Sequence, residues 1–376
     1  MSEYKCIPLG ENVEEMFIGP FGSSLKNECF VDENEAYCMV YEQKHAIHKT
    51  MNVETRYVNE QKYNELKRFS VHGGDIIISC RGTIGETFIV PDDAPLGIMH
   101  PSIMKIRLKD GVYDKYYFNL LLKSRLKKHE AEANGSGIKM AISATELGKE
   151  LFPVPMMEEQ QKIAHIIYQI CLVIEKRKQE LLSLDNLVKA RFVEMFGNPL
   201  DKSKVNKFFV ECVEFNPKKS EVKDMMHKEV SFVPMECVGI DGSFEIKEEG
   251  LVKDYYKGYT YFKDGDVLLA KITPCFENGK IAIAENCTNG IGFGTTEFHV
   301  SRPILGVSNS YWIKYMLKND NVHELATTNM TGSAGQKRIQ TPFFEKLKIY
   351  LPPIELQNQF ADFVHQVDKS KFMKFF

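Results

Sequence analysis

The alternation of hydrophobic and polar positions is most regular in residues 158–196, which contain neither Gly nor Pro. Apolar residues recur there in alternating steps of four and three, the heptad pattern of a coiled-coil helix. About 39 residues, at a rise of about 1.5 Å each, predict a helix of about 58 Å. The apolar seam consists of Ile163, Ile167, Ile170, Ile174, Leu181, Leu184, Val188 and Met195. Such a helix needs a partner that covers the seam, and the alternative is a buried helix within one large domain.

Shorter patterns on either side of this stretch predict strands and turns. Apolar runs at residues 76–78 and 267–270 each follow a Gly-Asp turn and have the length of a strand. Pro153 and Pro155 precede the long helix and Gly197 follows it, which are the boundary signals of a helix. We therefore predict an α/β fold class, with mixed α+β domains and long coiled-coil helices.

The same order of features occurs twice along the chain. A constant offset of 197 residues relates Gly135 to Gly332, Pro155 to Pro352, Gln160 to Gln357 and Ile163 to Phe360. The second copy of the seam consists of Phe360, Val364 and Val367. Two copies indicate a duplicated module in a pseudo-twofold arrangement rather than a repeat array. The expected divisions are a first domain at 1–157, a long helix at 158–198, a second domain at 199–352 and a shorter helix at 353–376.

Composition and charge place the chain among soluble globular proteins. Hydrophobic residues make up 43% and charged residues 26% of the chain, and the longest apolar runs are far too short to cross a membrane. The first residues lack a signal-peptide pattern, and the nine cysteines include no CxxC pair, so we expect a reducing cytoplasm. A net charge of −3 argues against a general nucleic-acid coat but permits local basic patches.

Motifs of catalysis and of metal binding are missing. The chain contains no GxGxxG, GxSxG, HExxH or EF-hand pattern, and residues 19–26 lack the spacing of a phosphate-binding loop. His45 and His48 form a close pair without cysteine or carboxylate neighbours, so we expect no metal. Asp75 and Asp266 each follow a Gly at a strand entrance, and turn formation explains both. We expect neither catalysis by this chain nor a cofactor bound to it.

Several short sequence motifs, which occur in order along the two copies, give the chain a family resemblance. The first half contains GPFGSSLK (19–26), GDIIISCRGTIG (74–85) and FPVPMMEEQQKI (152–163). The second half contains GYTYFKDGDVLLAKITPCFENGK (258–280), GIGFGTTEFHV (290–300), TGSAGQKRI (331–339) and LPPIELQNQF (351–360). Over nearly its whole length the chain resembles the DNA-specificity subunits of type I restriction–modification systems.

The resemblance implies two target-recognition domains, each binding one half of a split, asymmetric DNA site. It implies that the helices pack antiparallel, set the gap between the half-sites and dock two methyltransferase subunits that methylate adenine. Restriction subunits would join this core. S-adenosylmethionine, ATP and magnesium are expected on these partners, and this subunit would be non-catalytic.

The second helix departs from the family pattern. Residues 353–376 supply about half the length that the resemblance implies. We therefore expect much of the seam after Ile174 to lack an intramolecular cover. A second copy of the chain or a methyltransferase subunit would cover it, unless the chain is a shortened form.

Candidate DNA contacts follow from side-chain chemistry. Lys, Arg and hydroxyl groups bind phosphates, while Arg, Lys, Asn and Gln recognise base edges. In the first domain a basic loop and two Gly-bearing turns supply Gln43, Lys44, His45, His48, Lys49, Arg81, Thr83 and Lys139. In the second domain the candidates are Lys271, Thr273, Asn278, Lys280, Gln336, Lys337 and Arg338. The last three follow a Gly-rich loop that permits close approach to phosphate and are the strongest set.

Alternatives to these assignments remain open. Each basic loop can instead be an ordinary solvated loop, and we expect Phe21, Phe293 and Phe298 in the core rather than stacked on bases. The chain could serve another DNA-methylating anti-phage system with a related module, or join proteins through its coiled coil without binding DNA. A nuclease or methyltransferase acting alone is opposed by the missing motifs.

Overall fold

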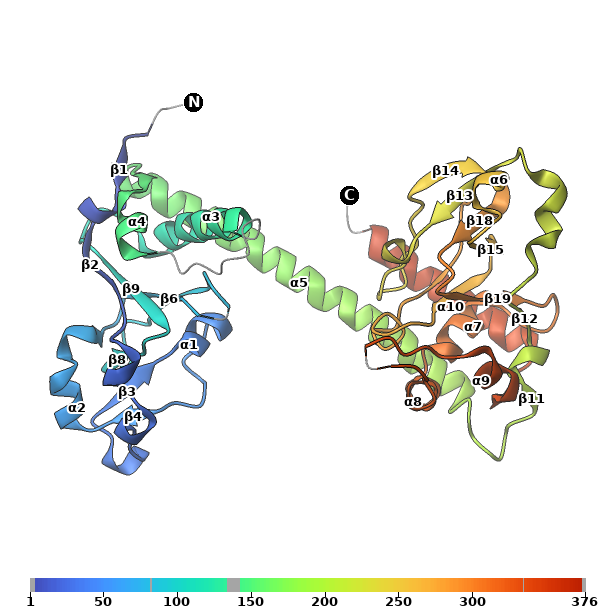
Figure 1. Ribbon diagram of the computed structural model, residues 1–376, viewed down its shortest axis with the longest axis horizontal. Coiled ribbons are helices and arrows are strands. Elements are labelled where there is room, and N and C mark those ends of the chain that lie inside the picture. The colour runs from blue at the N-terminus through green and yellow to red at the C-terminus, as the bar shows by residue number, and fades with distance from the viewer. Residues whose placement is uncertain (1–3, 82, 134–142, 334, 374–376) are drawn as a thin grey trace. The chain divides into compact units, whose positions relative to one another are not determined.

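The computed structural model of the chain describes residues 4–81, 83–133, 143–333 and 335–373. Its contacts divide the chain into two compact units, Met1–Glu175 and Lys176–Phe376. Helix α5 (Met157–Phe196) crosses this division as one continuous helix of 40 residues (Figure 1). The long helix predicted from the heptad pattern is therefore present.

The first unit is built on two four-stranded sheets. The first sheet is antiparallel, in the order β2 (Val13–Ile18), β9 (Ile103–Leu108), β6 (Ile76–Ser79) and β7 (Thr87–Ile89). The second has the order β4 (Tyr57–Val58), β3 (Cys38–Tyr41), β8 (Gly97–Met99) and β5 (Ser70–Val71). Its central pair, β3 and β8, is parallel. A short ladder joins β1 (Cys6–Pro8) to β10 (Leu151–Pro153).

Helices cover the first unit's sheets and close its core. They are α1 (Gln43–His48), α2 (Glu60–Glu65), α3 (Lys115–Ala133) and α4 (Ala144–Lys149). Phe118 and Leu122 of α3 are fully buried with Ile76 and Ile106 of the first sheet, and Ala164 of α5 belongs to the same cluster. The start of the long helix thus belongs to the first unit's core.

The second unit repeats both sheets in the same order. One sheet runs β12 (Val213–Phe215), β19 (Phe298–Pro303), β16 (Val267–Ala270) and β17 (Ile281–Ile283). The other runs β14 (Glu248–Leu251), β13 (Glu229–Val233), β18 (Ile291–Gly294) and β15 (Thr260–Lys263), again with its central pair parallel. The short ladder recurs between β11 (Lys207–Phe208) and β20 (Lys348–Ile349). The internal duplication predicted from the sequence is confirmed.

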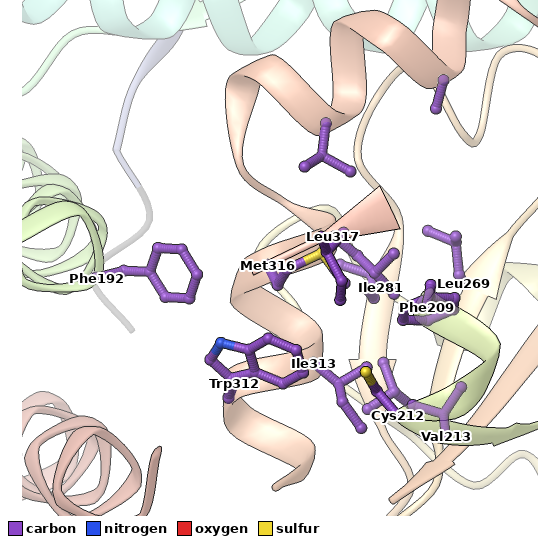
Figure 2. Close-up of a cluster of buried hydrophobic side chains, with 14 of the residues drawn as sticks. Phe192, Phe209, Cys212, Val213, Leu269, Ile281, Trp312, Ile313, Met316 and Leu317 are labelled. Carbon is purple, nitrogen blue, oxygen red and sulfur yellow. The ribbon is translucent and has the colours of Figure 1, made fainter. Parts of the chain in front are cut away.

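Helices also pack on the sheets of the second unit. They are α6 (Val252–Tyr255), α7 (Ser310–Leu317), α8 (Asp320–Thr328), α9 (Thr341–Lys346) and α10 (Ile354–Met373). Figure 2 shows Trp312 and Met316 of α7 in the cluster that includes Ile281 of the sheet and Phe192 of α5. The second half of α5 therefore belongs to the second unit's core.

In each unit, one buried glutamine joins the start of a helix to the loops beside it through three hydrogen bonds. Gln160 Nε2 donates to the carbonyls of Val112 and Pro155, at 2.9 Å each, while its Oε1 accepts from Asp114 N at 2.9 Å. Gln357 Nε2 donates to Val307 O at 3.0 Å and Pro352 O at 2.9 Å, and its Oε1 accepts from Asn309 N at 2.9 Å. Each amide therefore satisfies three backbone groups where the helix begins.

Both units also contain the same ion pair, formed by a buried aspartate and an arginine. Asp75 accepts two hydrogen bonds from Arg107, at 2.7 and 2.8 Å, and a third from the His72 amide at 2.8 Å. Asp266 does the same with Arg302, at 2.9 Å twice, and with the Lys263 amide at 2.8 Å. Both carboxylates stabilise a turn and hold a strand residue, which agrees with the structural role expected for them.

Helix α10 lies antiparallel to the second half of α5, and its seam is buried. The Phe360 ring lies 5.4 Å from Phe192 and 5.5 Å from Phe196. At the other end, Lys371 pairs with Asp185 at 2.8 Å, and its carbonyl accepts a hydrogen bond from Arg177. The seam members that this packing buries completely are Val188, Phe360, Val364 and Val367. Those that it leaves half-buried are Leu181, Leu184 and Met195.

We expected the seam after Ile174 to be exposed, but the exposed seam residues lie at and before Ile174. Ile170 and Ile174 are 52% and 48% exposed, whereas α10 covers α5 from Arg177 onward. Our expectation was wrong because an antiparallel helix that starts beside Phe196 covers the end of α5 first. Ile163 and Ile167 are half-buried, and Ile163 packs against the first unit's core.

Candidate nucleic-acid interface

Each unit gathers several loops at one end of its first sheet, which we call the sheet-end surface. In the first unit Ile18 pairs with Met104 and Ser79 with Ile103, so β2 and β6 finish where β9 starts. Residue 100 joins β8 to β9 at the same end. In the second unit Phe215 pairs with Ser301 and Ala270 with Phe298, which places the equivalent loops together. Most of the candidate residues lie on these two surfaces.

Close backbone packing fixes the centre of the first surface. His100 N donates to Tyr41 O at 2.9 Å, which ties the connection between β8 and β9 to the end of β3. A Cβ on Gly19 would collide with the carbonyl oxygen of His100. The glycine that opens the GPFGSSLK phrase is therefore needed for close approach rather than for phosphate binding.

The basic segment predicted as a loop is helix α1. Its residues Gln43, Lys44 and His48 lie on this helix, and Lys49 ends it in the left-handed conformation with φ 54°. His45 is completely buried, and its Nδ1 accepts from Glu42 N at 3.0 Å. Burial lowers the pKa of His45, which keeps the ring neutral. The structure therefore removes His45 from the candidate DNA contacts, because its ring forms part of the helix cap and the core.

Cations from three segments surround His100. Lys44 pairs with Glu42 at 2.7 Å, and Arg56 pairs with the same carboxylate. Burial raises the pKa of Glu42, but hydrogen bonds from Arg56 and Lys44 outweigh this and lower it overall. Burial lowers the pKa of His100; the charge of Glu42 raises it in part, and the charges of Arg56, Arg81 and Lys44 lower it. The sheet-end surface of the first unit is therefore locally positive, with Glu42 as its internal counter-charge.

The other candidates of the first unit lie around this cluster. Arg81 and Thr83 are exposed in the loop after β6, and Lys49 pairs with Glu86 at 3.2 Å. Lys139 lies outside the described residues. Phe21, expected in the core, is 87% exposed, so that expectation was wrong, whereas Phe293 and Phe298 are buried as expected.

In the second unit the structure brings together two candidate segments that are distant in sequence. Thr273 N donates to Lys337 O at 2.9 Å, and Ile339 N donates to Lys271 O at 2.9 Å. Gln336 and Lys337 are exposed beside them. The Gly-rich loop and the end of β16 therefore form one continuous surface.

Two candidate cations of the second unit already have partners. Arg338 donates from Nε to Glu297 Oε2 and from Nη2 to Glu297 Oε1, at 3.0 Å each. Lys280 Nζ donates to the carbonyl of Met235 at 3.0 Å, while Asn278 is exposed. Within the described part of the chain no carboxylate pairs with Lys337, so Lys337 is the stronger candidate for a phosphate contact in the Lys337–Arg338 set.

Sequence reasoning missed a groove that adjoins Lys271. It has a volume of about 560 Å³, and among its lining residues are Lys218, Lys219, Tyr256 and Tyr259. The Lys218–Lys219 doublet after β12 was the one local signal for it. The tyrosines come from a segment about 40 residues later, and only the fold brings the two together.

Two kinds of site are absent from the part of the chain that the structure describes. Among the described residues, no group of three His, Cys, Asp or Glu side chains lies close enough to hold a metal ion. No helix in the described ranges is both long and apolar enough to cross a membrane.

Comparison with known proteins decides the family. The model of the type I restriction modification DNA specificity domain matches residues 12–184 and 213–374. The chain belongs to this family. The two matched segments correspond to the two units, each carrying one copy of the duplicated sheets.

Relatives of this family match parts of the chain. The Escherichia coli type I restriction enzyme EcoAI and EcoEI specificity subunits are 46% identical over 150 residues and 47% identical over 147 residues. These matches cover 39% and 38% of this chain, and the chain spans about a quarter of the length of both relatives, 25% and 24%. The MjaVIII specificity subunit of Methanocaldococcus jannaschii is 23% identical over 80% of this chain and 74% of its own length.

Solved structures share the fold at low sequence identity. The specificity subunit of a type I restriction–modification system from M. genitalium has a TM-score of 0.52 and 15% identity, covering 98% of this chain and 90% of that one. A chain from a structure of a type I restriction–modification assembly also has a TM-score of 0.52, with 14% identity over 99% of this chain and 91% of its own.

Proposed function

We propose that this chain is the DNA sequence-specificity subunit of a type I restriction–modification complex. Each module, at residues 1–157 and 199–352, binds one half of a split, asymmetric duplex site. The duplicated sheet-end surface supports this proposal most strongly, because it presents cations in both units. The chain also belongs to the family of the type I restriction modification DNA specificity domain. Cations bind the phosphates, and neighbouring polar side chains contact the bases.

In this proposal the helices at 158–198 and 353–376 set the gap between the half-sites and dock two methyltransferase subunits. The exposed apolar residues near the middle of α5 support a docking role, because such a stripe is stabilised by a partner. They are Ile166, Ile170, Val173 and Ile174, with exposures of 47%, 52%, 66% and 48%. Restriction subunits complete the complex. S-adenosylmethionine, ATP and magnesium belong to these partners, and the chain acts on DNA in the cytoplasm without catalysis or a cofactor of its own.

Selection from random duplexes tests the proposal directly. The chain, purified together with a cognate methyltransferase subunit, is incubated with a random-sequence library, and the bound fraction is sequenced. The expected result is enrichment of two unlike half-sites at one fixed separation. Enrichment of a single uninterrupted motif, or equal enrichment by the methyltransferase subunit alone, would contradict the proposal.

A further inference from the structure

The groove beside Lys271 is bounded by three segments of the second unit. Residues 216–220 follow β12, residues 256–261 lead into β15, and residues 296–299 lead into β19. Lys271 closes one side at the end of β16. Its 560 Å³ falls within the range of about 300–1,000 Å³ that is typical of ligand sites.

The groove has an excess of positive charge. Lys218, Lys219 and Lys271 line it, and in the described ranges none of them forms an ion pair with a carboxylate. Two acidic residues in or next to these segments are already paired. Glu221 binds Lys263 at 2.6 Å and Arg302 at 3.0 Å, and Glu297 binds Arg338 at 3.0 Å. The three ammonium groups are therefore available to an external anion.

Aromatic side chains stand beside these ammonium groups. Lys219 Nζ lies 5.5 Å from the centre of the Tyr256 ring. Tyr259 packs edge-on against Phe232 at 4.9 Å and stays 37% exposed. Tyrosine offers a flat apolar surface and a hydroxyl at a small loss of conformational entropy, which suits contact with a sugar beside a phosphate.

The floor of the groove is held in one conformation. Asn216 has φ 53°, and its Oδ1 accepts from Val300 N at 2.9 Å. Its amide nitrogen lies 3.3 Å from His299 Nδ1, and His299 Nε2 donates to Ile339 O at 2.9 Å. These contacts assign donor and acceptor to the ring nitrogens, so the floor is neutral and fully bonded. The charge of the groove comes from its lysines.

The first unit has an aromatic ring at the position that corresponds to Asn216. Strand pairing puts Phe17 opposite Lys105 in β9, and Asn216 binds Val300 at the same point of β19. The Phe17 ring packs against Phe69 at 5.7 Å. Lys105 Nζ lies 5.0 Å from the centre of the same ring, so an aromatic ring and a buried lysine stand where the second unit has Asn216 and Val300.

We infer that the tyrosine–lysine groove of the second unit binds the sugar–phosphate backbone of duplex DNA next to the second half-site. Lys218, Lys219 and Lys271 hold the phosphates, and Tyr256 and Tyr259 contact the adjoining deoxyribose. Such contacts position the module on the duplex and leave the choice of bases to other residues. This inference rests on the proposed function.

The test uses the complex with a methyltransferase subunit and a duplex that carries the selected split site. A triple variant, K218A/K219A/K271A, is compared with wild type by fluorescence anisotropy at several salt concentrations. Each lost phosphate contact flattens the slope of log affinity against log salt by about 0.9, so a loss of about two to three units is expected. The control K223A/K228A/K253A removes three lysines of the same unit that do not line the groove, and its slope should change by less than one unit.

Replacing single phosphates by neutral methylphosphonates shows where the groove contacts the DNA. Methylphosphonates placed along the second half-site should weaken wild-type binding about fivefold or more at the contacted positions and leave the triple variant unaffected. The base sequence that the triple variant selects should stay unchanged. A wild-type complex that binds the split site while the triple variant keeps its slope would overturn the inference and leave the proposed function intact.

A protein ligand gives a different pattern. If the groove held an acidic segment of a partner protein, the triple variant would lose the methyltransferase subunit during gel filtration and retain the salt slope in whatever complex remained. That result would also overturn the inference. Failure of the wild-type complex to select any split site would instead contradict the proposed function itself.

Discussion

The two units share their interior and differ at the surface. Both have the same sheet order, the same buried Asp–Arg pair and the same glutamine clamp at the start of a helix. At the sheet-end surface the first unit has helix α1 and a carboxylate surrounded by cations, whereas the second has an open groove and two paired loops. Buried polar groups need every partner in place, so they tolerate few changes, while surface loops tolerate many.

The largest expected effect comes from breaking the shared ion pair. Asp266 is 1% exposed, and Asp266→Ala leaves Arg302 without its bidentate partner. We expect a loss of about 3–4 kcal/mol in the unfolding free energy of the second unit. The single tryptophan, buried Trp312, reports this unit alone in a urea titration.

The matched control for this prediction is the exposed partner of Arg302. Glu214→Ala removes a half-exposed carboxylate 3.5 Å from Arg302 and should change stability by less than about 1 kcal/mol. Asp75→Ala should destabilise the first unit to a similar degree, measured by hydrogen exchange. A much smaller effect of Asp75→Ala would show that the two interiors are not energetically equivalent.

The glutamine clamps should contribute the next largest effect. Gln160→Ala and Gln357→Ala each leave three buried or partly buried backbone groups without a partner, and we expect a loss of about 2–3 kcal/mol in the unit concerned. The exposed neighbours Gln161 and Gln359 supply the controls Gln161→Ala and Gln359→Ala, which should be nearly neutral. Thermal melts of all four variants compare the clamps, and equal melting temperatures in clamp and control variants would refute their role.

Acid should destabilise the second unit through His299. Burial lowers the pKa of His299 to about 4, whereas an unfolded chain has a value near 6.5. The folded form disfavours the proton, so the stability is present above pH 6.5 and is lost as the pH falls toward 4. From pH 7 to pH 5 this single group should remove about 2 kcal/mol.

Trp312 fluorescence during urea unfolding at both pH values checks the His299 prediction. His299→Gln keeps a donor toward Ile339 O and removes the titration. The variant should therefore lose about 2 kcal/mol less than wild type between these pH values. An equal loss in both proteins would assign the acid sensitivity to other groups.

Single exposed cations should have the smallest effect. Lys337→Ala should flatten the salt slope of DNA binding by about one unit, because this exposed side chain has no carboxylate partner in the described residues. Arg81→Ala should do the same for the first half-site. Lys223→Ala is the charge-matched control, and a control effect as large as that of Lys337→Ala would show that only net charge matters.

The long helix and the duplication could be predicted because both are periodic signals in the chain itself. The exposed end of the seam could not, because which half of α5 is covered depends on where the antiparallel α10 begins. The seam predicted from the heptad pattern also lacked Phe192 and Phe196, which contact Phe360. They lie outside the strict heptad and are buried by the adjacent module.

The candidate site was predictable in part. The loops after β6 and β16 carry Arg81 and Lys271, and Gly-Asp turns in the sequence mark both strands. Helix α1 was predicted as a loop because six residues are too few to show helical periodicity, and packing on β6 and β7 decides its fold. The groove could not be predicted, because its lysines and tyrosines meet only in three dimensions.

Methylome sequencing would show directly whether this chain selects a split DNA site for methylation. A host expresses this chain with and without a cognate methyltransferase subunit, and each subunit alone serves as a control. We expect a split adenine-methylated motif, with two unlike half-sites and a fixed gap, that appears only when both subunits are present. A single uninterrupted motif, or the same motif without this chain, would contradict this expectation.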